Sequence, residues 1–471
     1  METERYYLDL FKVTRAQMEK TTATALSHGG DFCDLYFEHT TFFNLLLKDG
    51  VVSSGGFHTD YGVGIRVLKG EKTGYAYSEN TEMTDMLKAA QAASAIALGT
   101  TGNRTYAPVE NRRLDLYPMK RNWRDFGADA FLPFLKDLEK EIFSRDSRIV
   151  KVVVRLSDSV TDIMMYNSLG ELTFDKRPMG SVSVSAVFEQ DGKTENKSAA
   201  RSFRMGAELA GPALVRELAD EVVKGIDARF EARRPKGGQM NVVMGAGASG
   251  ILLHEAMGHA FEADFNRKGQ SIFSDKMGQR ICPKGVNVVD DGTVAFNRGS
   301  GNYDDEGVAG EKTYMVTDGI LTSYLHDRIS ASWYGVRPTG NGRRENFRYN
   351  PIPRMRATYM ESGDADPQSI IADVTQGIYV DEFSNGQVKI GEGDFTFFVK
   401  SGYLIENGPL TMPVMDINII GNGPQALADI LAVGNDLKID NGTWTCGKEQ
   451  SVAVSCGMPT VLVRNLTVGG E

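Results

Sequence analysis

The chain has 471 residues, of which 41% are apolar and 24% charged, enough to bury several cores and to form about three domains. The formal net charge of −10 argues against general nucleic-acid binding, because the phosphate backbone attracts basic surfaces. Four cysteines are too few for a disulfide framework, and we find no signal peptide and no run of about 18 apolar residues, so we expect a cytoplasmic protein.

The first half of the chain predicts two units with one order of elements: helix, antiparallel strands, helix. In the first unit, a helix over residues 13–28, capped by Thr14, precedes strands over 32–47, 62–68 and 72–77 and a helix over 82–98. In the second, a helix over 125–142 precedes strands over 149–156, 161–167, 171–174, 182–190 and 198–203 and a helix over 206–229. Turns at 48–50 and 168–170 fall at comparable places, so we predict an internal structural duplication.

A polar segment over residues 229–238 ends in Pro235-Lys236-Gly237-Gly238 and predicts a domain boundary. Beyond it, glycine turns at 317–319 and 406–408 predict hairpins, and helices are expected over 249–264, 327–334, 367–373 and 423–433. We predict an α+β fold of mostly antiparallel sheets, with duplicated N-terminal units and a larger strand-rich C-terminal domain. The predicted domains are 1–110, 111–234 and 235–471.

The most informative chemical pattern follows an apolar strand over 241–244, on a helix that carries His254, Glu255 and His259. Neutral imidazoles bind zinc and related ions, and a carboxylate beside a ligand can take a proton from an activated water. The familiar HExxH pattern places its histidines on one helical face, but here they are five residues apart. On a regular helix they would point about 140° apart. We therefore predict a π-bulge or a local break between them, which Gly258 would permit.

The spacing alone is a weak motif, and two ordinary histidines on a half-exposed helix are the alternative interpretation. A third ligand must come from elsewhere in the chain. Glu262 is a candidate to bind the metal or to orient a ligand, or is otherwise a solvated carboxylate. Cys446 lies in a glycine-flanked loop, and Cys456 is a competing choice, although a lone cysteine is more often an inert buried residue. Cys33 and Cys282 lie in apolar surroundings and are predicted to be structural.

Five arginines form a basic cluster with little acid nearby in the sequence: Arg343, Arg344, Arg348, Arg354 and Arg356. Arg343 and Arg344 are candidate substrate-binding residues, because guanidinium groups can hold the carboxylates or the terminus of a peptide. The alternative is a domain or subunit interface tied by ion pairs.

Three other patterns carry weaker predictions. The stretch 245–250 follows the G-x-G-x-x-G pattern of dinucleotide sites, but no parallel βαβ setting is apparent. The acidic stretch 304–307 lacks the ligand spacing of a calcium loop and is predicted to be a turn. Tyr349 and His326 are possible site groups that are more often structural.

Several motifs resemble the TldD/PmbA family of metallopeptidases. The stretch from His254-Glu-Ala-Met-Gly-His259 to Asn266-Arg267 is similar to the core motif of that family. Further similarities lie at Gly340-Asn-Gly-Arg-Arg344, Gly402-Tyr-Leu-Ile-Glu-Asn-Gly408, Cys446-Gly-Lys, Gln450-Ser451-Val452 and Asn465-Leu-Thr-Val-Gly-Gly470. The matches are concentrated between about residue 240 and residue 470, which would make the last domain the metal-binding one.

The resemblance implies one zinc ion per catalytic subunit, bound by His254, His259 and Cys446, with Glu255 as general base. It implies hydrolysis of unfolded or flexible peptides, including leader peptides of modified microcins. It also implies a homodimer, or a heterodimer with a PmbA-type (TldE) paralogue that lacks the histidine motif. This chain keeps the motif and resembles the catalytic type. Its Cys446 loop is one residue shorter than the Gly-Lys-x-Gly-Gln-Ser expected of the family.

Two other functions stay open. A non-catalytic regulatory or interaction protein, acting on gyrase or on a toxin–antitoxin pair, would keep its function in a Glu255→Gln variant. A purely structural metal site would contribute folding energy, so that chelation would lower thermal stability. We expect neither direct nucleic-acid binding nor membrane binding.

Overall fold

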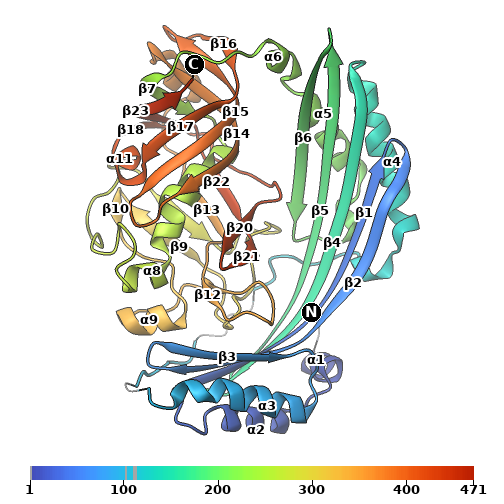
Figure 1. Ribbon diagram of the computed structural model, residues 1–471, viewed down its shortest axis with the longest axis vertical. Coiled ribbons are helices and arrows are strands. Elements are labelled where there is room, and N and C mark those ends of the chain that lie inside the picture. The colour runs from blue at the N-terminus through green and yellow to red at the C-terminus, as the bar shows by residue number, and fades with distance from the viewer. Residues whose placement is uncertain (1–2, 101–102, 110–113, 471) are drawn as a thin grey trace.

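The structure, a computed structural model, describes residues 3–100, 103–109 and 114–470. A long, curved, six-stranded antiparallel sheet with its helices faces a strand-rich C-terminal part (Figure 1). This arrangement confirms the predicted α+β class with mostly antiparallel sheets. None of the helices in the described part of the chain is long and apolar enough to cross a membrane.

The six-stranded sheet joins the strands of both predicted units in the order β3-β2-β1-β4-β5-β6. Its strands are β1 (Phe32–Lys48), β2 (Val51–Lys69), β3 (Lys72–Ser78), β4 (Ile149–Asn167), β5 (Leu172–Gln190) and β6 (Lys193–Phe203). Antiparallel pairing of β1 with β4 makes the sheet continuous between the units. The predicted boundary between residues 110 and 111 lies outside the described residues, and the division into three domains stays a prediction.

Two strands are longer than predicted. Residues 149–167 form one strand and residues 172–190 another, whereas the sequence predicted two strands in each. In the second, Pro178 and Gly180 lie between the two predicted strands. Pro178 instead lies where β5 pairs with β4 alone, a setting that tolerates a missing N–H donor. Gly180 leaves room for the ring of Trp123, which a β-carbon would overlap.

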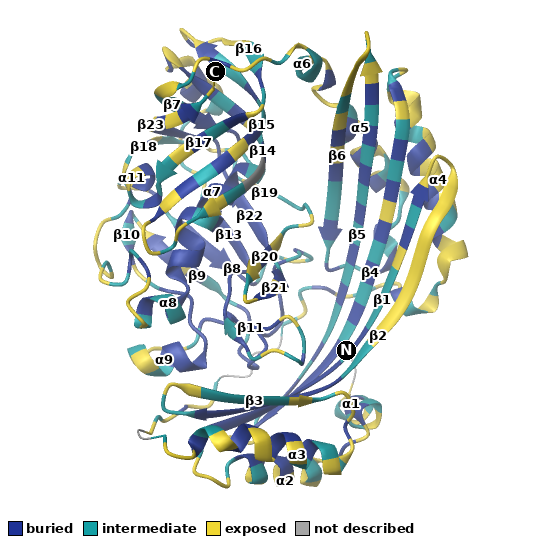
Figure 2. Ribbon diagram, in the orientation of Figure 1, coloured by how far each residue is buried: buried dark blue, intermediate teal, exposed yellow. Residues whose placement is uncertain are grey.

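Helices cover the sheet in two groups: α1 (Glu4–Phe11), α2 (Arg15–Ala25) and α3 (Met83–Ser94), then α4 (Ala128–Arg145), α5 (Pro212–Val223) and α6 (Ile226–Glu231). Each group packs on the sheet around its own apolar core. Thr14 caps α2 as predicted, in a reciprocal capping box with Gln17, whereas α1 was not predicted. Over residues 182–188 of β5, apolar side chains of even number are buried and the serines between them are half-buried, an alternation visible in Figure 2.

The C-terminal part contains two larger sheets. The first holds β7 (Gly238–Met244), β14 (Gln376–Val388), β15 (Asp394–Glu406), β16 (Leu410–Val414), β17 (Ile417–Asn422), β18 (Ile430–Val433) and β23 (Val461–Gly469). The second holds β8 (Val288–Asp291), β9 (Lys312–Thr317), β10 (Ile320–Leu321), β13 (Ala357–Met360), β19 (Lys438–Ile439) and β22 (Ser455–Met458). The hairpins predicted at 317–319 and 406–408 are confirmed.

Two short ladders and five short helices complete this part. The ladders are β11 (Gly342–Arg343) with β12 (Ile352–Pro353), and β20 (Thr445–Lys448) with β21 (Gln450–Ala453). The helices are α7 (Ile251–Leu253), α8 (Ala263–Arg267), α9 (Arg328–Tyr334), α10 (Pro367–Ala372) and α11 (Gly423–Ala428). The helix predicted over 423–433 is too long, because the chain enters β18 after Ala428.

Buried ion pairs join the six-stranded sheet to the C-terminal part. Arg66 of β2 is fully buried, pairs with Asp34 of β1, and reaches Glu306 at 2.7 Å. Arg177 of β5 reaches Asp305 at 2.6 Å. The acidic stretch 304–307 forms a turn, as predicted. The turn is also a buried junction, because its carboxylates meet arginines that come from distant strands.

The helical path to the metal-ligand candidates starts immediately after β7. A short 3₁₀ turn, Ala248–Gly250, leads into α7. A β-carbon on Gly250 would overlap the backbone of Gly457 in β22, so the helix lies as close to that strand as glycine permits.

We predict that Gly250→Ala lowers the free energy of unfolding by about 1–3 kcal/mol, because the clashing partner is backbone and cannot turn away. Chemical denaturation would measure it. Gly469→Ala is the matched control, since its β-carbon would make only an ordinary contact at 3.6 Å. Equal stability of the two variants would contradict the close approach.

A second prediction concerns Asp158 of β4, whose pKa is raised by burial to about 7 from an ordinary 3.8. The unfolded chain loses this proton at lower pH than the folded chain, so the carboxyl destabilises the fold increasingly between pH 3.8 and about 7. Asp158→Asn should be more stable than wild type at pH 8, by up to about 4 kcal/mol, and equal to it below pH 3.8. Unfolding measured against pH, with the exposed Asp137→Asn as control, tests this; a pH-independent difference would refute it.

Candidate metal centre

The helix changes pitch at the histidines. α7 continues into one π-helical turn, His254–Gly258, and then into a 3₁₀ turn, His259–Phe261. The His259 N–H donates to the His254 carbonyl, a hydrogen bond across five residues. The two rings consequently meet edge to face with centroids 5.1 Å apart. The predicted distortion is confirmed, and it resolves the mismatch between a five-residue spacing and a regular helix.

Gly258 contributes to this turn differently from the prediction. Its φ of −55° and ψ of −53° are ordinary helical values that any residue adopts. A β-carbon there would overlap the sulfur of Met355, a buried side chain of the core. Glycine is therefore required for close packing, and its freedom of backbone conformation is not used.

Cys446 reaches the histidines from the β20–β21 hairpin. Lys448 pairs with Gln450 across a single intervening residue, Glu449, which has a left-handed φ of 57°. The shorter loop noted in the sequence thus forms a tight turn, and β20 keeps its register. The Cys446 Sγ lies 3.3 Å from the His259 Nε2.

The donor set fits a divalent ion with a preference for nitrogen and sulfur. The ligand atoms of His254, His259 and Cys446 all lie within 4.8 Å of one another, and all three residues are buried. Ligands placed tetrahedrally at about 2.0–2.3 Å from zinc would be roughly 3.3–3.6 Å apart. Burial raises the pKa of Cys446, but the neighbouring His254 and His259 lower it to about 5, so the thiolate that metals prefer is favoured at neutral pH.

Glu262 is fully buried and orients His259. Its Oε2 lies 3.0 Å from the His259 Nδ1 and 3.1 Å from the Lys448 Nζ, and its Oε1 lies 3.6 Å from the Arg354 Nε. Burial raises the pKa of Glu262, but Lys448, His259 and Arg354 lower it to about 2. The interpretation of Glu262 as a solvated carboxylate is wrong; it lies behind a ligand candidate, where it fixes the ring orientation.

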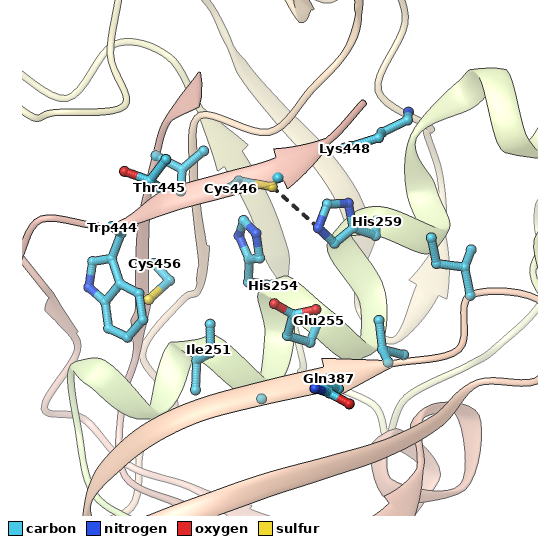
Figure 3. A pocket seen from close by; sticks show the side chains of 15 residues that line it. Ile251, His254, Glu255, His259, Gln387, Trp444, Thr445, Cys446, Lys448 and Cys456 are labelled. Atoms are coloured by element: carbon cyan, nitrogen blue, oxygen red, sulfur yellow. Dashed lines mark hydrogen bonds between the residues drawn. The ribbon is translucent and has the colours of Figure 1, made fainter. Parts of the chain in front are cut away.

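Glu255 lies beside the three ligand candidates, in a cavity of about 630 Å³. Figure 3 shows its carboxylate between His254, His259 and the strand that carries Gln387. Burial is the main cause that raises its pKa, and Cys446 and Glu262 add to it against the opposing effect of both histidines. Cys456 and Trp444 line the same cavity, while the predicted ligand set uses Cys446.

The five clustered arginines separate into different settings. Arg344 donates to the Asp305 carbonyl at 3.0 Å and stacks over Tyr36 at 4.2 Å, which supports the interface interpretation. Arg348 pairs with Asp60 at 3.3 Å. Arg354 donates to the Cys446 carbonyl at 2.7 Å, next to the metal-ligand candidates. The remaining two, Arg343 and Arg356, are buried and donate to backbone carbonyls.

Two residues that support the site were not assigned a role from the sequence. Lys448 lies 2.7 Å from Asp264 and 3.1 Å from Glu262, so it joins the hairpin to the helix. Both Lys448 and Asp264 lie within the motifs that carry the family resemblance, and their opposite charges were the available signal. Their separation of nearly two hundred residues concealed the contact.

Solved structures share this fold. A Thermotoga maritima protein described as a candidate modulator of a DNA gyrase superposes with a TM-score of 0.78 at 22% identity, covering 97% of this chain and 100% of that one. TldE from Thermococcus kodakarensis superposes with a TM-score of 0.76 at 17% identity, covering 96% and 100%. At these identities the similarity establishes the fold.

Relatives found by sequence share more identical residues with this chain than these solved structures do. A metalloprotease TldD homolog of Haemophilus influenzae is 36% identical over 93% of both chains. A zinc metalloprotease TldD homolog of Saccharolobus solfataricus is 31% identical over 62% of this chain and 65% of its own. Three family models match in order: PmbA/TldA metallopeptidase domain 1 over residues 33–97, the central domain over 121–228 and the C-terminal domain over 237–470. The chain therefore belongs to the TldD/PmbA family of metallopeptidases, as a relative of its TldD-type members.

Proposed function

We propose that this chain is an HExxxH-type metallopeptidase that hydrolyses unfolded or flexible peptides, with one zinc ion held by His254, His259 and Cys446 and with Glu255 as general base. The observation that carries the proposal is the convergence of two imidazoles and a thiol within 4.8 Å, beside a carboxylate in an open cavity. The nitrogen and sulfur donors favour zinc over magnesium or calcium, and the Saccharolobus relative is named a zinc metalloprotease.

A bound ion would supply Lewis acidity to a water molecule and to the carbonyl of the scissile peptide bond. Glu255 would accept a proton from the attacking water and return it to the departing amine. Burial raises its pKa, which suits a group that must first take a proton and then release it. The fully buried Glu262 would keep the His259 ring turned so that Nε2 faces Cys446.

The cavity wall supports an extended substrate. Gly386, Gln387 and Val388 of β14 line it, and Figure 3 shows the strand at Gln387 beside Glu255. β14 pairs with β7 only over Gly377–Val380, whereas its pairing with β15 continues to Val388. The backbone on the other side of residues 386–388 is thus available for an extended peptide to add as a strand. A folded protein cannot present such a segment, so selectivity would come from access.

Assembly and location complete the proposal. The chain would act as a homodimer or with a TldE-type paralogue, in the reducing cytoplasm that its cysteine usage indicates. The alternatives are a structural metal site and a non-catalytic interaction protein. A structural zinc site normally has four protein ligands, and among the described residues the metal-ligand group contains three.

We predict that Glu255→Gln keeps zinc but loses about 10²- to 10⁴-fold in cleavage rate of an unfolded peptide, because the general base is removed. Cleavage of a fluorogenic peptide and metal content by mass spectrometry measure the two properties. Glu19→Gln, an exposed change on α2, is the matched control and should cleave like wild type.

Two outcomes would contradict this prediction. If Glu255→Gln cleaves at the wild-type rate, Glu255 is not the base. If wild type loads zinc but cleaves nothing, even with a TldE-type partner, the non-catalytic interpretation replaces the peptidase. Chelation that lowers the free energy of unfolding by several kcal/mol in such an inactive protein would favour the structural site.

A further prediction concerns Glu262→Gln. It leaves Arg354 and Lys448 without their shared buried carboxylate, so we expect a loss of about 3–5 kcal/mol in the free energy of unfolding. Zinc affinity should fall about 10- to 100-fold, because the His259 ring loses a charged acceptor. Denaturation and competitive zinc titration measure these effects. Unchanged zinc affinity in a folded variant would show that Glu262 does not orient the ligand.

A further inference from the structure

Two more cavities follow the candidate metal centre along the inner face of the six-stranded sheet. Each has a volume of about 410 Å³. Thr445 lines both the cavity of the metal centre and the nearer of the two further cavities. Arg298 lines both the nearer and the farther one. The three cavities therefore form a row between the sheet and the C-terminal part.

Three arginines of this row have neutral partners. Arg343 donates to the carbonyls of Met355 and Ala453 at 2.5 and 2.8 Å. Arg298 donates to the Trp444 carbonyl at 2.9 Å and to the Ser202 hydroxyl at 2.7 Å. Arg204 donates to the Ser300 carbonyl and stacks over a tyrosine. Within the described residues, none of the three forms an ion pair with a carboxylate.

The acidic groups that line these two cavities either have other partners or have pKa values raised by burial. Asp305 binds Arg177 and Asp60 binds Arg348. Glu345 accepts from the Ser451 N–H at 2.6 Å. Burial raises the pKa of both Glu38 and Asp158 to about 7, which favours their neutral forms in acidic solution. No one of these five carboxyl groups lies in ion-pair contact with Arg204, Arg298 or Arg343 in the described chain.

Burying cations together without counter-charge is costly. Burial and the neighbouring Arg204 lower the pKa of Arg298 to about 10. Burial, with Arg356 and Arg204 nearby, also lowers the pKa of Arg343, against the opposing effect of the Asp305 carboxylate. Elsewhere the same interface pairs its buried arginines with aspartate and glutamate, as Arg66 does. The three arginines thus have an unmet preference for an anion.

The positions of Arg298 and Arg343 link this preference for an anion to the metal centre. Arg298 binds the hairpin at Trp444 and Thr445, and Arg343 binds it at Ala453. Thr445 and Ala453 are register partners across β20 and β21, so both guanidinium groups lie at the same end of the hairpin that carries Cys446.

We propose that Arg204, Arg298 and Arg343 form an anion subsite that binds a carboxylate of the peptide substrate, beyond the hairpin from the metal centre. This inference rests on the proposed peptidase function and deepens it by naming a substrate class. The carboxylate comes from an acidic side chain or from the C-terminus of the peptide. General charge attraction would give the opposite preference, because the formal net charge of the chain is −10.

The test measures binding without hydrolysis. Four labelled unfolded peptides share one sequence frame, with acidic side chains or their amides and with a free or an amidated C-terminus. Their Kd values are measured by fluorescence anisotropy on zinc-loaded Glu255→Gln protein. We expect one carboxylate source to bind about tenfold more tightly than its neutral counterpart, with a difference that shrinks as salt is added. The pair that differs identifies the source.

Variants of Arg298 test whether the preference for a charged peptide comes from the subsite. Arg298→Gln, at a half-buried position, should abolish the difference, and Arg298→Lys should keep part of it. Arg280→Gln, exposed and paired with Asp318, is the matched control and should keep all of it. Equal Kd values for all four peptides, or a preference that persists in folded Arg298→Gln protein, would overturn the subsite. Failure of cleavage alone would overturn the peptidase function and leave these binding results interpretable.

Discussion

A single buried carboxylate, that of Glu262, holds the candidate metal centre together. It contacts a ligand candidate, His259, and two cations, Lys448 and Arg354. Lys448 belongs to the hairpin that carries Cys446, and Arg354 donates to the Cys446 carbonyl. The helix that supplies two donors and the strand that supplies the third therefore meet through one charge. Because such a charge is stable in the interior only when its partners are in place, the loss of any one of these contacts should weaken the whole site.

At the interface between the six-stranded sheet and the C-terminal part, buried arginines also need partners, and they find two kinds. Where the six-stranded sheet meets residues 304–306, each buried arginine finds a carboxylate, as Arg66 and Arg177 do. Farther along the same interface, Arg298 and Arg343 have carbonyls and hydroxyls only. The first set ties the two parts of the molecule together. The second leaves positive charge facing a cavity, where we propose the anion subsite.

Backbone geometry positions the reacting groups as much as charge does. One π-helical turn brings His254 and His259 together, and one left-handed residue, Glu449, closes the Cys446 hairpin. Close packing holds the helical distortion in place: Gly258 lies against Met355, and Gly250 lies against β22. Strained or unusual turns of this kind persist where the surrounding structure determines them fully.

Local patterns in the sequence determined much of the fold and of the site. Alternating apolar residues predicted the strands, Thr14 predicted the start of α2, and the five-residue spacing of His254 and His259 required a break in helical pitch. These features depend on neighbours within a few residues. The glycine-flanked loop made Cys446 a candidate ligand, but Cys456 competed with it, and the family resemblance decided between them.

Tertiary structure alone decided the rest. It joined β1 to β4 in one sheet, buried Glu262 between Lys448 and Arg354, and separated arginines with carboxylate partners from arginines without them. It also showed that Gly258 is needed for space against Met355. In each case the partner is distant in the chain, and whether a charge is paired, exposed or left facing a cavity depends on which remote segments the fold brings against it.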